Sequence, residues 1–265
     1  MVKEFQNKNY WALILGGSSG LGLATAKKLA KHGCNICIIH RNRRSELTAI
    51  ENEFTAIKNE GVELLTFNVD AFKEEEREKI IEQLKRKFEN KAKIRVLVHS
   101  VAKGNLKPMI ADDKPVLKNV DFQLTINAMA ISLYDWIKAL FDQQLFAADT
   151  RIISFTSEGN SKAWRNYAAV SAAKVTLEAI TRNIALEFAP YGIKANCIQA
   201  GVTDTASLRA IPGSEKIKEH SLARNPFKRL TMPEDVANVV YLLCKDEAAW
   251  INGCVIPVDG GEHIS

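Results

Sequence analysis

Short runs of aliphatic and β-branched residues alternate along the chain with longer segments in which apolar residues recur every three or four positions. Continuous apolar runs are typical of strands buried on both faces of a parallel sheet, and the longer pattern is typical of covering helices. We expect strands at Trp11–Leu15, Asn35–His40, Glu63–Phe67, Arg95–His99, Arg151–Phe155, Lys194–Gln199 and Cys254–Val258. The pattern therefore predicts an α/β fold, a mostly parallel seven-stranded sheet with helices on both faces.

Between the second and third expected strands, one apolar stripe has helical spacing. It consists of Leu47, Ile50, Phe54 and Ile57. Gly33 and Gly61 each follow an expected helix, and glycine is the residue best suited to the left-handed conformation that ends one. The sequence thus predicts a helix that lays one apolar face on the sheet.

The segment from Gly201 to Lys228 differs from the rest, because it carries Pro212-Gly213 and Asn225-Pro226 and has little periodicity. Such long irregular segments often cover a binding site, so we expect a mobile lid here. The sequence contains neither a low-complexity linker nor a tandem repeat. We expect residues 1–265 to form a single domain whose segment near 201–228 covers the substrate.

Composition narrows the classes of protein further. The 265 residues are 46% hydrophobic, but no apolar stretch approaches the length of a membrane span, and the N-terminal residues lack the apolar core of a signal peptide. We expect a cytoplasmic protein. The net charge of +5 is modest; it suits an acidic partner or a phosphorylated ligand, or simply a solvated surface, and nucleic-acid binding is disfavoured.

The five cysteines are scattered, and most lie inside apolar runs. Reduced core thiols are therefore expected, with neither disulfides nor a metal site. Cys34 and Cys37 are spaced like a redox pair, but they lie at the entry to a strand, which favours a structural role.

A glycine-rich turn directly follows the first strand and opens the first helix. Its residues include Gly16, Ser18, Ser19, Gly20, Leu21 and Gly22. Glycines allow the backbone to approach a pyrophosphate, and the amides at a helix N-terminus favour phosphate charge. A tight turn alone would explain the glycines, but the strand-turn-helix context favours a dinucleotide site in a Rossmann-type doubly wound fold.

The end of the second strand should select the cofactor. An acidic residue there would bind the ribose hydroxyls of NAD, yet the chain reads Ile39-His40-Arg41-Asn42-Arg43-Arg44. Arginine forms paired hydrogen bonds with a phosphate. NADPH is therefore expected, with Arg41 as the best single candidate and Arg43 or Arg44 able to share its role. NADH and a merely solvated basic loop stay open.

At this point the sequence resembles the short-chain dehydrogenase/reductase family over nearly its whole length. The family's glycine motif matches at Gly16, Gly20 and Gly22, and later motifs match at Asn127, at Arg229–Val236 and at Val258–Gly261. The resemblance implies further cofactor contacts at Asn68, Val69, Ser100, Val101, Gly201, Val202, Thr203 and Thr205. It also implies a homotetramer, with the helices around Phe122–Phe146 and Asn166–Ala189 as the interface.

One motif departs from the commoner members. Tyr167 lies seven residues before Lys174, whereas most ketone and alcohol enzymes of the family place tyrosine where this chain has Val170. If the segment is helical, Tyr167 and Lys174 share a face, and Tyr167 lies about 4.5 Å farther along the axis than position 170. The oxygen of an enoyl thioester is three bonds from the β-carbon, so a displaced hydroxyl suits that substrate.

The resemblance supports the same interpretation, because His99-Ser100-Val101-Ala102 and the tyrosine-six-residues-lysine spacing are similar to enoyl-acyl-carrier-protein reductases. The expected reaction of this NAD(P)H-dependent oxidoreductase is reduction of a trans-2-enoyl thioester in fatty-acid synthesis. Tyr167 would stabilise the enolate, Lys174 would bind the nicotinamide ribose, and Ser157 would assist the thioester oxygen or only line the pocket. Asn127 would hold the active-site helix or a proton-relay water, or would simply be a buried asparagine that bonds within its helix.

The sequence leaves the partner protein and several alternative functions open. An acidic acyl carrier protein could dock on Arg209, Lys216, Lys218 and Arg224, although ordinary solvated helix charges are the favoured account of most of these residues. A crevice for the acyl chain could be lined by Trp164, Leu208, Ile211 and Phe227. The alternatives are reduction of a 3-oxoacyl thioester or other carbonyl, a coenzyme A substrate, and a non-catalytic NADP-binding regulator.

Overall fold

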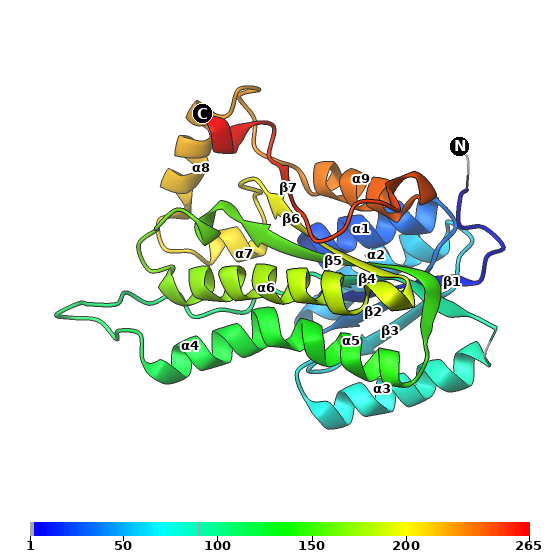
Figure 1. The fold of residues 1–265 in the computed structure, drawn as a ribbon. Coiled ribbons are helices and arrows are strands. Elements are labelled where there is room, and N and C mark those ends of the chain that lie inside the picture. Colours follow the sequence, from blue (N-terminus) through cyan, green and yellow to red (C-terminus); the bar gives the residue numbers. More distant parts are fainter. Residues whose placement is uncertain (1–2, 90) are drawn as a thin grey trace.

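The computed structural model describes residues 3–89 and 91–265, and within these ranges seven parallel strands form one sheet in the order β3-β2-β1-β4-β5-β6-β7 (Figure 1). The strands are β1 Tyr10–Leu15, β2 Asn35–His40, β3 Leu64–Asn68, β4 Lys93–His99, β5 Phe146–Ser157, β6 Ile193–Ala200 and β7 Val255–Val258. Every expected strand is confirmed. The largest difference is at β5, which begins five positions earlier than its apolar core predicts.

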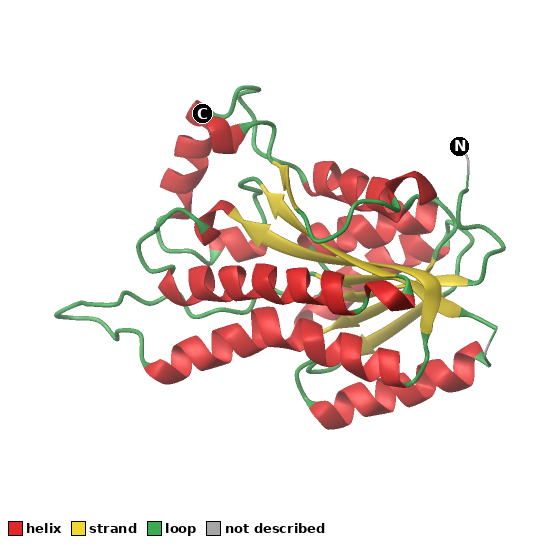
Figure 2. Cartoon of the chain, viewed as in Figure 1, coloured by secondary structure: helices red, strands yellow, loops and turns green. Residues whose placement is uncertain are grey.

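Helices cover both faces of the sheet (Figure 2). One face carries α1 Gly20–Lys31, α2 Leu47–Lys58 and α9 Pro233–Cys244, and the other carries α3 Glu74–Phe88, α4 Asn119–Ile126, α5 Ser132–Asp142 and α6 Ala168–Glu187. This is the predicted Rossmann-type doubly wound fold. The chain leaves β1 toward one side and β4 toward the other, so a crevice opens at their carboxyl ends, where such folds bind ligands.

The predicted apolar stripe of α2 faces the sheet. Ile50, Phe54 and Ile57 are buried there, in a cluster that also contains the buried side chains of β2. Gly33 and Gly61 follow α1 and α2 with φ angles of 86° and 83°, so both adopt the left-handed conformation expected at a helix end.

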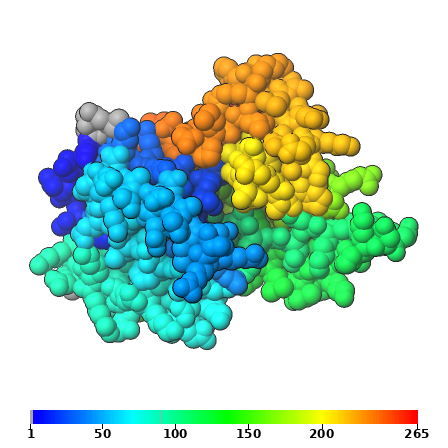
Figure 3. Space-filling view, turned by 180° about the vertical axis from the view of Figure 1, so that it is seen from behind, coloured from blue at the N-terminus to red at the C-terminus, as the bar shows by residue number. Residues whose placement is uncertain are grey.

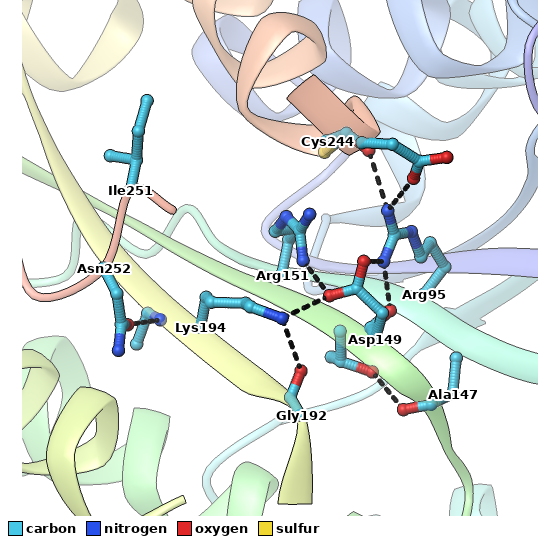
Figure 4. Close-up of polar contacts among 12 residues, drawn as sticks. Arg95, Ala147, Asp149, Arg151, Gly192, Lys194, Cys244, Ile251 and Asn252 are labelled. Atoms are coloured by element: carbon cyan, nitrogen blue, oxygen red, sulfur yellow. Dashed lines mark hydrogen bonds and ion pairs between the residues drawn. The ribbon is translucent and has the colours of Figure 1, made fainter. Parts of the chain in front are cut away.

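A charged network lies at the amino-terminal ends of β4, β5 and β6, opposite the crevice. Figure 4 shows Arg95, Arg151 and Lys194 converging on Asp149. The two arginines are almost completely buried, and they also donate to the last carbonyls of α9, Arg95 to that of Cys244 at 3.2 Å. These cations neutralise Asp149 and satisfy the carbonyls that a helix leaves unpaired at its end.

Cys34 and Cys37 are both buried, and burial raises the pKa of both thiols. They are core residues, as expected, and lack the exposed thiolate that redox chemistry needs. Within the described residues, no set of three His, Cys, Asp or Glu side chains is grouped to hold a metal ion. Over the same residues, no helix is both long enough and apolar enough to span a membrane.

Candidate active site

A cavity of about 550 Å³ opens at the carboxyl ends of the strands. Figure 3 shows it as a hollow between the N-terminal part of the chain, in blue, and the segment that follows β6, in yellow. It is lined by residues that follow β1, β2, β4, β5 and β6, and by α6, α7 Ala206–Arg209 and α8 Ser214–Arg224. The predicted dinucleotide turn and the predicted tyrosine and lysine therefore share one cavity.

The glycine-rich turn lines one end of this cavity. A Cβ at Gly16 would lie 2.2 Å from the carbonyl oxygen of Ser100, and one at Gly20 would lie 3.4 Å from Thr205 across the opening. Both glycines have positive φ angles. A side chain at Gly16 would therefore clash with the segment after β4, and one at Gly20 would fill the space between the N-terminus of α1 and the loop after β6. These glycines leave room for a pyrophosphate.

Most of the predicted cofactor contacts line the cavity. They are Gly16, Ser18, Ser19, Gly20, Leu21, Arg41, Val69, Ser100, Val101, Lys174, Gly201, Val202, Thr203 and Thr205. Gly22 does not; a Cβ there would lie 2.3 Å from the carbonyl oxygen of Gly16, so this glycine lets α1 pack against the turn.

Asn68 is the second predicted contact that lies outside the cavity lining. Its side chain accepts a hydrogen bond from the backbone amide of Asn42 at 2.9 Å and donates one to the carbonyl of Asn42 at 3.2 Å. Its role is thus to hold the loop after β2. The hydroxyl of Ser18 donates to the side chain of Asn42 at 2.8 Å, which joins that loop to the glycine-rich turn. Sequence reasoning missed Asn42, because a polar loop residue carries no distinguishing pattern.

Arg41 projects from this loop into the cavity opening. Its guanidinium lies 2.7 Å from a carboxylate oxygen of Asp70, and its side chain is 65% exposed. One side of the guanidinium is held, and the solvated remainder can meet a phosphate. Arg43 and Arg44 lie outside the cavity lining, so Arg41 is the one of the three arginines that the fold places there.

Tyr167 does not lie within a helix, which corrects the expected geometry. The helix α6 begins at Ala168, and Tyr167 precedes it with φ −112° and ψ 0°, after Asn166 in the left-handed region. The carbonyl of Tyr167 accepts the first helical hydrogen bond, from the amide of Ser171 at 2.8 Å. Tyr167 and Lys174 nevertheless both reach the cavity, together with Val170.

The phenol of Tyr167 lies against the carboxyl end of β5. Its oxygen is 3.4 Å from the hydroxyl of Ser157, and its ring packs against Trp164 with a centroid separation of 5.1 Å. Burial raises the pKa of Tyr167, against a smaller opposing effect of Ser157. The phenol therefore stays protonated near neutral pH and can donate a hydrogen bond to an oxygen in the cavity.

Lys174 is buried on α6, and its ammonium donates to the carbonyl of Phe155 at 2.6 Å. Burial lowers the pKa of Lys174 to about 8, against opposing effects of Cys197 and Glu178. The side chain is charged at neutral pH and close to titration.

Asn127 differs from its expected place. It begins a short π-helix, Asn127–Ile131, between α4 and α5, and its side chain is exposed and outside the cavity lining. The expectation that Asn127 holds an active-site helix or a relay water is wrong, because this wider turn changes which side chains face inward.

His99 is buried, and its ring lies 2.8 Å from the hydroxyl of Ser132 on α5. Burial, and to a smaller extent the charge of Lys174, lowers the pKa of His99 to about 3.

The segment after β6 is more ordered than its sequence pattern predicts, because it contains α7 and α8. Leu208 and Ile211 are buried and line the cavity near Trp164, as expected. Phe227 is 75% exposed and outside that lining, so its place in the crevice was predicted wrongly.

Three charged residues of the cavity were not recognised as a group from the sequence. The guanidinium of Arg224, at the end of α8, lies 2.6 Å from Glu158 and 2.9 Å from Glu262, and all three side chains are largely buried. Arg224 therefore does not belong to an exposed docking patch. Arg209 pairs with Asp204 and Lys218 with Glu215, at 2.9 and 2.7 Å. The separation of residues 158, 224 and 262 in the chain explains why no sequence pattern joined them.

Comparison with known proteins places this geometry in context. Residues 16–263 match the family model described as enoyl-(acyl carrier protein) reductase. An acetoacetyl-CoA reductase of Allochromatium vinosum is 26% identical over 252 residues, which cover 94% of this chain and 97% of that protein. The crystal structure of an enoyl-[acyl-carrier-protein] reductase (NADH) from Aquifex aeolicus is 26% identical and has a TM-score of 0.82, with 98% of each chain covered. The enoyl-acyl carrier protein reductase of Bacillus cereus, solved with NADP+, has a TM-score of 0.86 at 24% identity, over 100% of this chain and 99% of that one, and supports the fold.

Proposed function

Because the chain belongs to the short-chain dehydrogenase/reductase family, we propose that it is an enoyl-[acyl-carrier-protein] reductase of fatty-acid synthesis that uses NADPH. Membership makes it an oxidoreductase that binds a nicotinamide dinucleotide. The finer proposal concerns the bond that is reduced, a carbon–carbon double bond conjugated to a thioester.

The arrangement of α6 carries this proposal. Val170 lines the cavity at the position from which the commoner family members present their tyrosine, so no hydroxyl is available there. The hydroxyl comes instead from Tyr167, one residue before the helix begins. In an enoyl thioester, the oxygen that the enzyme must bind is three bonds away from the carbon that receives hydride. A donor displaced from the commoner position suits this substrate better than a ketone.

The residues of the chain divide the chemistry as follows. Bound NADPH supplies the hydride that the β-carbon receives. Tyr167 donates a hydrogen bond to the thioester oxygen and stabilises the negative charge that develops on it, and Ser157 supports the phenol. The ammonium of Lys174 is held by the carbonyl of Phe155. Its charge adds positive potential, which favours the negatively charged oxygen. The α-carbon of the enolate then takes a proton from water, which completes the reduction.

The walls of the cavity suit an acyl chain. Met129, Tyr167, Val170, Leu208 and Ile211 belong to one apolar cluster, against which Leu106 and Trp164 pack. Apolar walls with a few convergent polar groups are typical of sites for small, largely apolar ligands. An aliphatic chain would bury its surface there, while the thioester oxygen reaches Tyr167.

Arg41 supports the choice of NADPH, because it lies at the cavity opening after β2, where a 2′-phosphate would be held. An acyl carrier protein is proposed as the donor of the thioester. With Arg224 turned inward, and with Lys218 only 17% exposed between Asp204 and Glu215, the proposed docking surface for the carrier protein is reduced to Arg209 on α7 and Lys216 on α8.

A carbonyl reductase is the second candidate, and the similarity to an acetoacetyl-CoA reductase favours it. The same Tyr167 would then donate to the ketone oxygen. A non-catalytic regulator is disfavoured by the joint presence of Tyr167, Lys174 and Ser157 around the cavity.

One assay separates these functions. The purified protein is incubated with NADPH or NADH and a trans-2-enoyl thioester, which is carried either on acyl carrier protein or on coenzyme A. Oxidation of the cofactor is followed by the loss of nicotinamide absorbance. A 3-oxoacyl thioester is assayed in parallel. Oxidation with the enoyl substrate supports the proposal, and oxidation with the 3-oxoacyl substrate alone would overturn it.

A further inference from the structure

The ring of Tyr167 rests on the short turn Glu158–Asn160 that follows β5. A Cβ at Gly159 would lie 2.5 Å from Cε1 and 3.0 Å from Cδ1 of this ring, so the turn and the ring are in direct contact. Because Tyr167 precedes α6, no helical turn encloses it. Its position depends on this turn, on the neighbouring ring of Trp164 and on the apolar cluster that lines the cavity.

Both neighbours of Gly159 are anchored by side chains from other elements. Glu158 accepts two hydrogen bonds from the guanidinium of Arg224, at 3.0 and 2.6 Å, and the amide of Asn160 donates to Glu178 on α6 at 2.6 Å. Paired arginine–carboxylate bonds fix orientation as well as distance, and they are strongest where water is largely excluded. The side chains of Arg224 and Glu158 are each only 12% exposed.

Arg224 joins this turn to two further parts of the cavity wall. It is the last residue of α8, which belongs to the segment after β6. It also donates to Glu262 at 2.9 Å, and the other carboxylate oxygen of Glu262 lies 3.3 Å from the backbone amide of Val202. One guanidinium therefore holds the turn under Tyr167, the end of α8 and, through Glu262, the loop after β6.

We propose that Arg224 is a positioning residue for Tyr167, which it holds in place through Glu158 and the turn that supports the phenol ring. Placement of the end of α8 at the cavity wall and alignment of the Tyr167 hydroxyl are then coupled. The inference rests on the role of Tyr167 in the proposed function, but not on whether the substrate is an enoyl or an oxoacyl thioester.

The position of the ring can be measured without turnover. The chain contains five tyrosines, which are replaced by 3-fluorotyrosine, and the ¹⁹F resonance of Tyr167 is identified by its loss in Tyr167→Phe. The test variants are Glu158→Gln and Arg224→Lys. Glu158→Gln leaves Arg224 paired with Glu262, so it avoids an unpaired buried cation and keeps the test available if Arg224→Lys does not fold.

Arg229→Gln is the matched control. Arg229 also forms a two-point pair with a carboxylate, Asp235, at 2.6 and 3.1 Å, but it is 55% exposed and lies outside the lining of the cavity. We expect the Tyr167 resonance to move in both test variants and to stay in place in the control. An unchanged Tyr167 resonance in the folded test variants overturns the inference.

Steady-state kinetics provide a second measurement. Misplacement of the Tyr167 hydroxyl should lower kcat between about tenfold and a hundredfold in both test variants. The KM for NADPH should stay within about twofold in Glu158→Gln, which keeps the pair of Arg224 with Glu262 and so the loop after β6. In a Tyr167→Phe background the same substitutions should lower kcat no further. A shifted resonance combined with wild-type turnover of Tyr167→Phe would leave the positioning inference standing and remove Tyr167 from the proposed function.

Discussion

Tyr167 is the side chain on which the chemistry depends most directly. Tyr167→Phe removes the hydroxyl and keeps the ring that packs on Trp164 and Gly159. Loss of a donor to a developing oxyanion should lower kcat by about a hundredfold to a thousandfold. Cofactor affinity, measured by NADPH fluorescence, should not change. Wild-type turnover in this variant would contradict the assigned role.

Arg41 can be tested separately, because it follows β2 and so lies on a different element of the cavity wall from Tyr167 and Lys174. Arg41→Ala should raise the KM for NADPH about tenfold to a hundredfold, the equivalent of losing a charged hydrogen bond, and leave the KM for NADH nearly unchanged. Arg43→Ala, outside the cavity lining, is the control. An unaltered ratio of the two constants in Arg41→Ala would exclude Arg41 from cofactor selection.

Lys174 makes the reaction dependent on pH. Its pKa of about 8, lowered by burial, means that the ammonium is charged below that pH and neutral above it. The positive potential favours the oxyanion, so kcat/KM should fall as pH rises through about 8, while Tyr167, whose pKa is raised by burial, stays protonated. A pH–rate profile measures this directly. In Lys174→Met, kcat/KM should be lower than in the wild type at neutral pH, and its decrease near pH 8 should disappear.

At the scale of elements, the strands β4, β5 and β6 are tied together at their amino-terminal ends by Asp149. Burial raises the pKa of this carboxyl, but hydrogen bonds from Arg151, Lys194 and Arg95 outweigh burial and hold its pKa below the ordinary value. Asp149→Asn should destabilise the fold by an amount between the roughly 1 kcal/mol of an exposed pair and the roughly 3–5 kcal/mol of a buried one.

The pH dependence of this effect has a definite sign. A carboxyl with a depressed pKa stabilises the fold fully above its unfolded pKa, about 4, and this stabilisation is lost progressively as pH falls from there through the lower folded-state pKa. Urea unfolding should therefore separate wild type from Asp149→Asn at pH 7, and the difference should shrink steadily as the pH is lowered below about 4, without vanishing at pH 3, because the folded carboxyl is still ionised there. Asp142→Asn, which removes an exposed pair with Lys138, should change stability by less than about 0.5 kcal/mol. Equal losses of stability in the two variants would show that the network around Asp149 stabilises the fold no more than an exposed ion pair does.

At the scale of the whole molecule, we propose that four copies assemble through α4, α5 and α6. Large apolar side chains are exposed on these helices, including Leu124, Tyr134, Val175 and Leu186. Light scattering should give four times the chain mass of 29.5 kDa. Leu124→Glu with Val175→Glu should produce smaller species, and a monomeric wild type would contradict the proposal.

Some features of this protein follow from local sequence. The seven strands, the helix stops at Gly33 and Gly61, and the glycine-rich turn were predictable, because backbone preference and apolar periodicity act over a few neighbouring residues. The presence of Tyr167, Val170 and Lys174 around one cavity was also predictable, since their spacing repeats along a helix. The helical segment begins one residue later than that spacing assumed.

Other features were decided only by tertiary structure. The π-helix turned Asn127 outward, Phe227 faced solvent, and Arg224 joined Glu158 and Glu262 inside the cavity instead of lying on a docking surface. Each of these outcomes depends on burial and on charges brought together from distant parts of the chain. Burial and such pairing change the energy of a polar group far more than its sequence neighbours do, and they exist only once the elements have packed. The sequence by itself therefore determined the sheet, the cofactor turn and the residues available for chemistry, and the packing decided which of them meet.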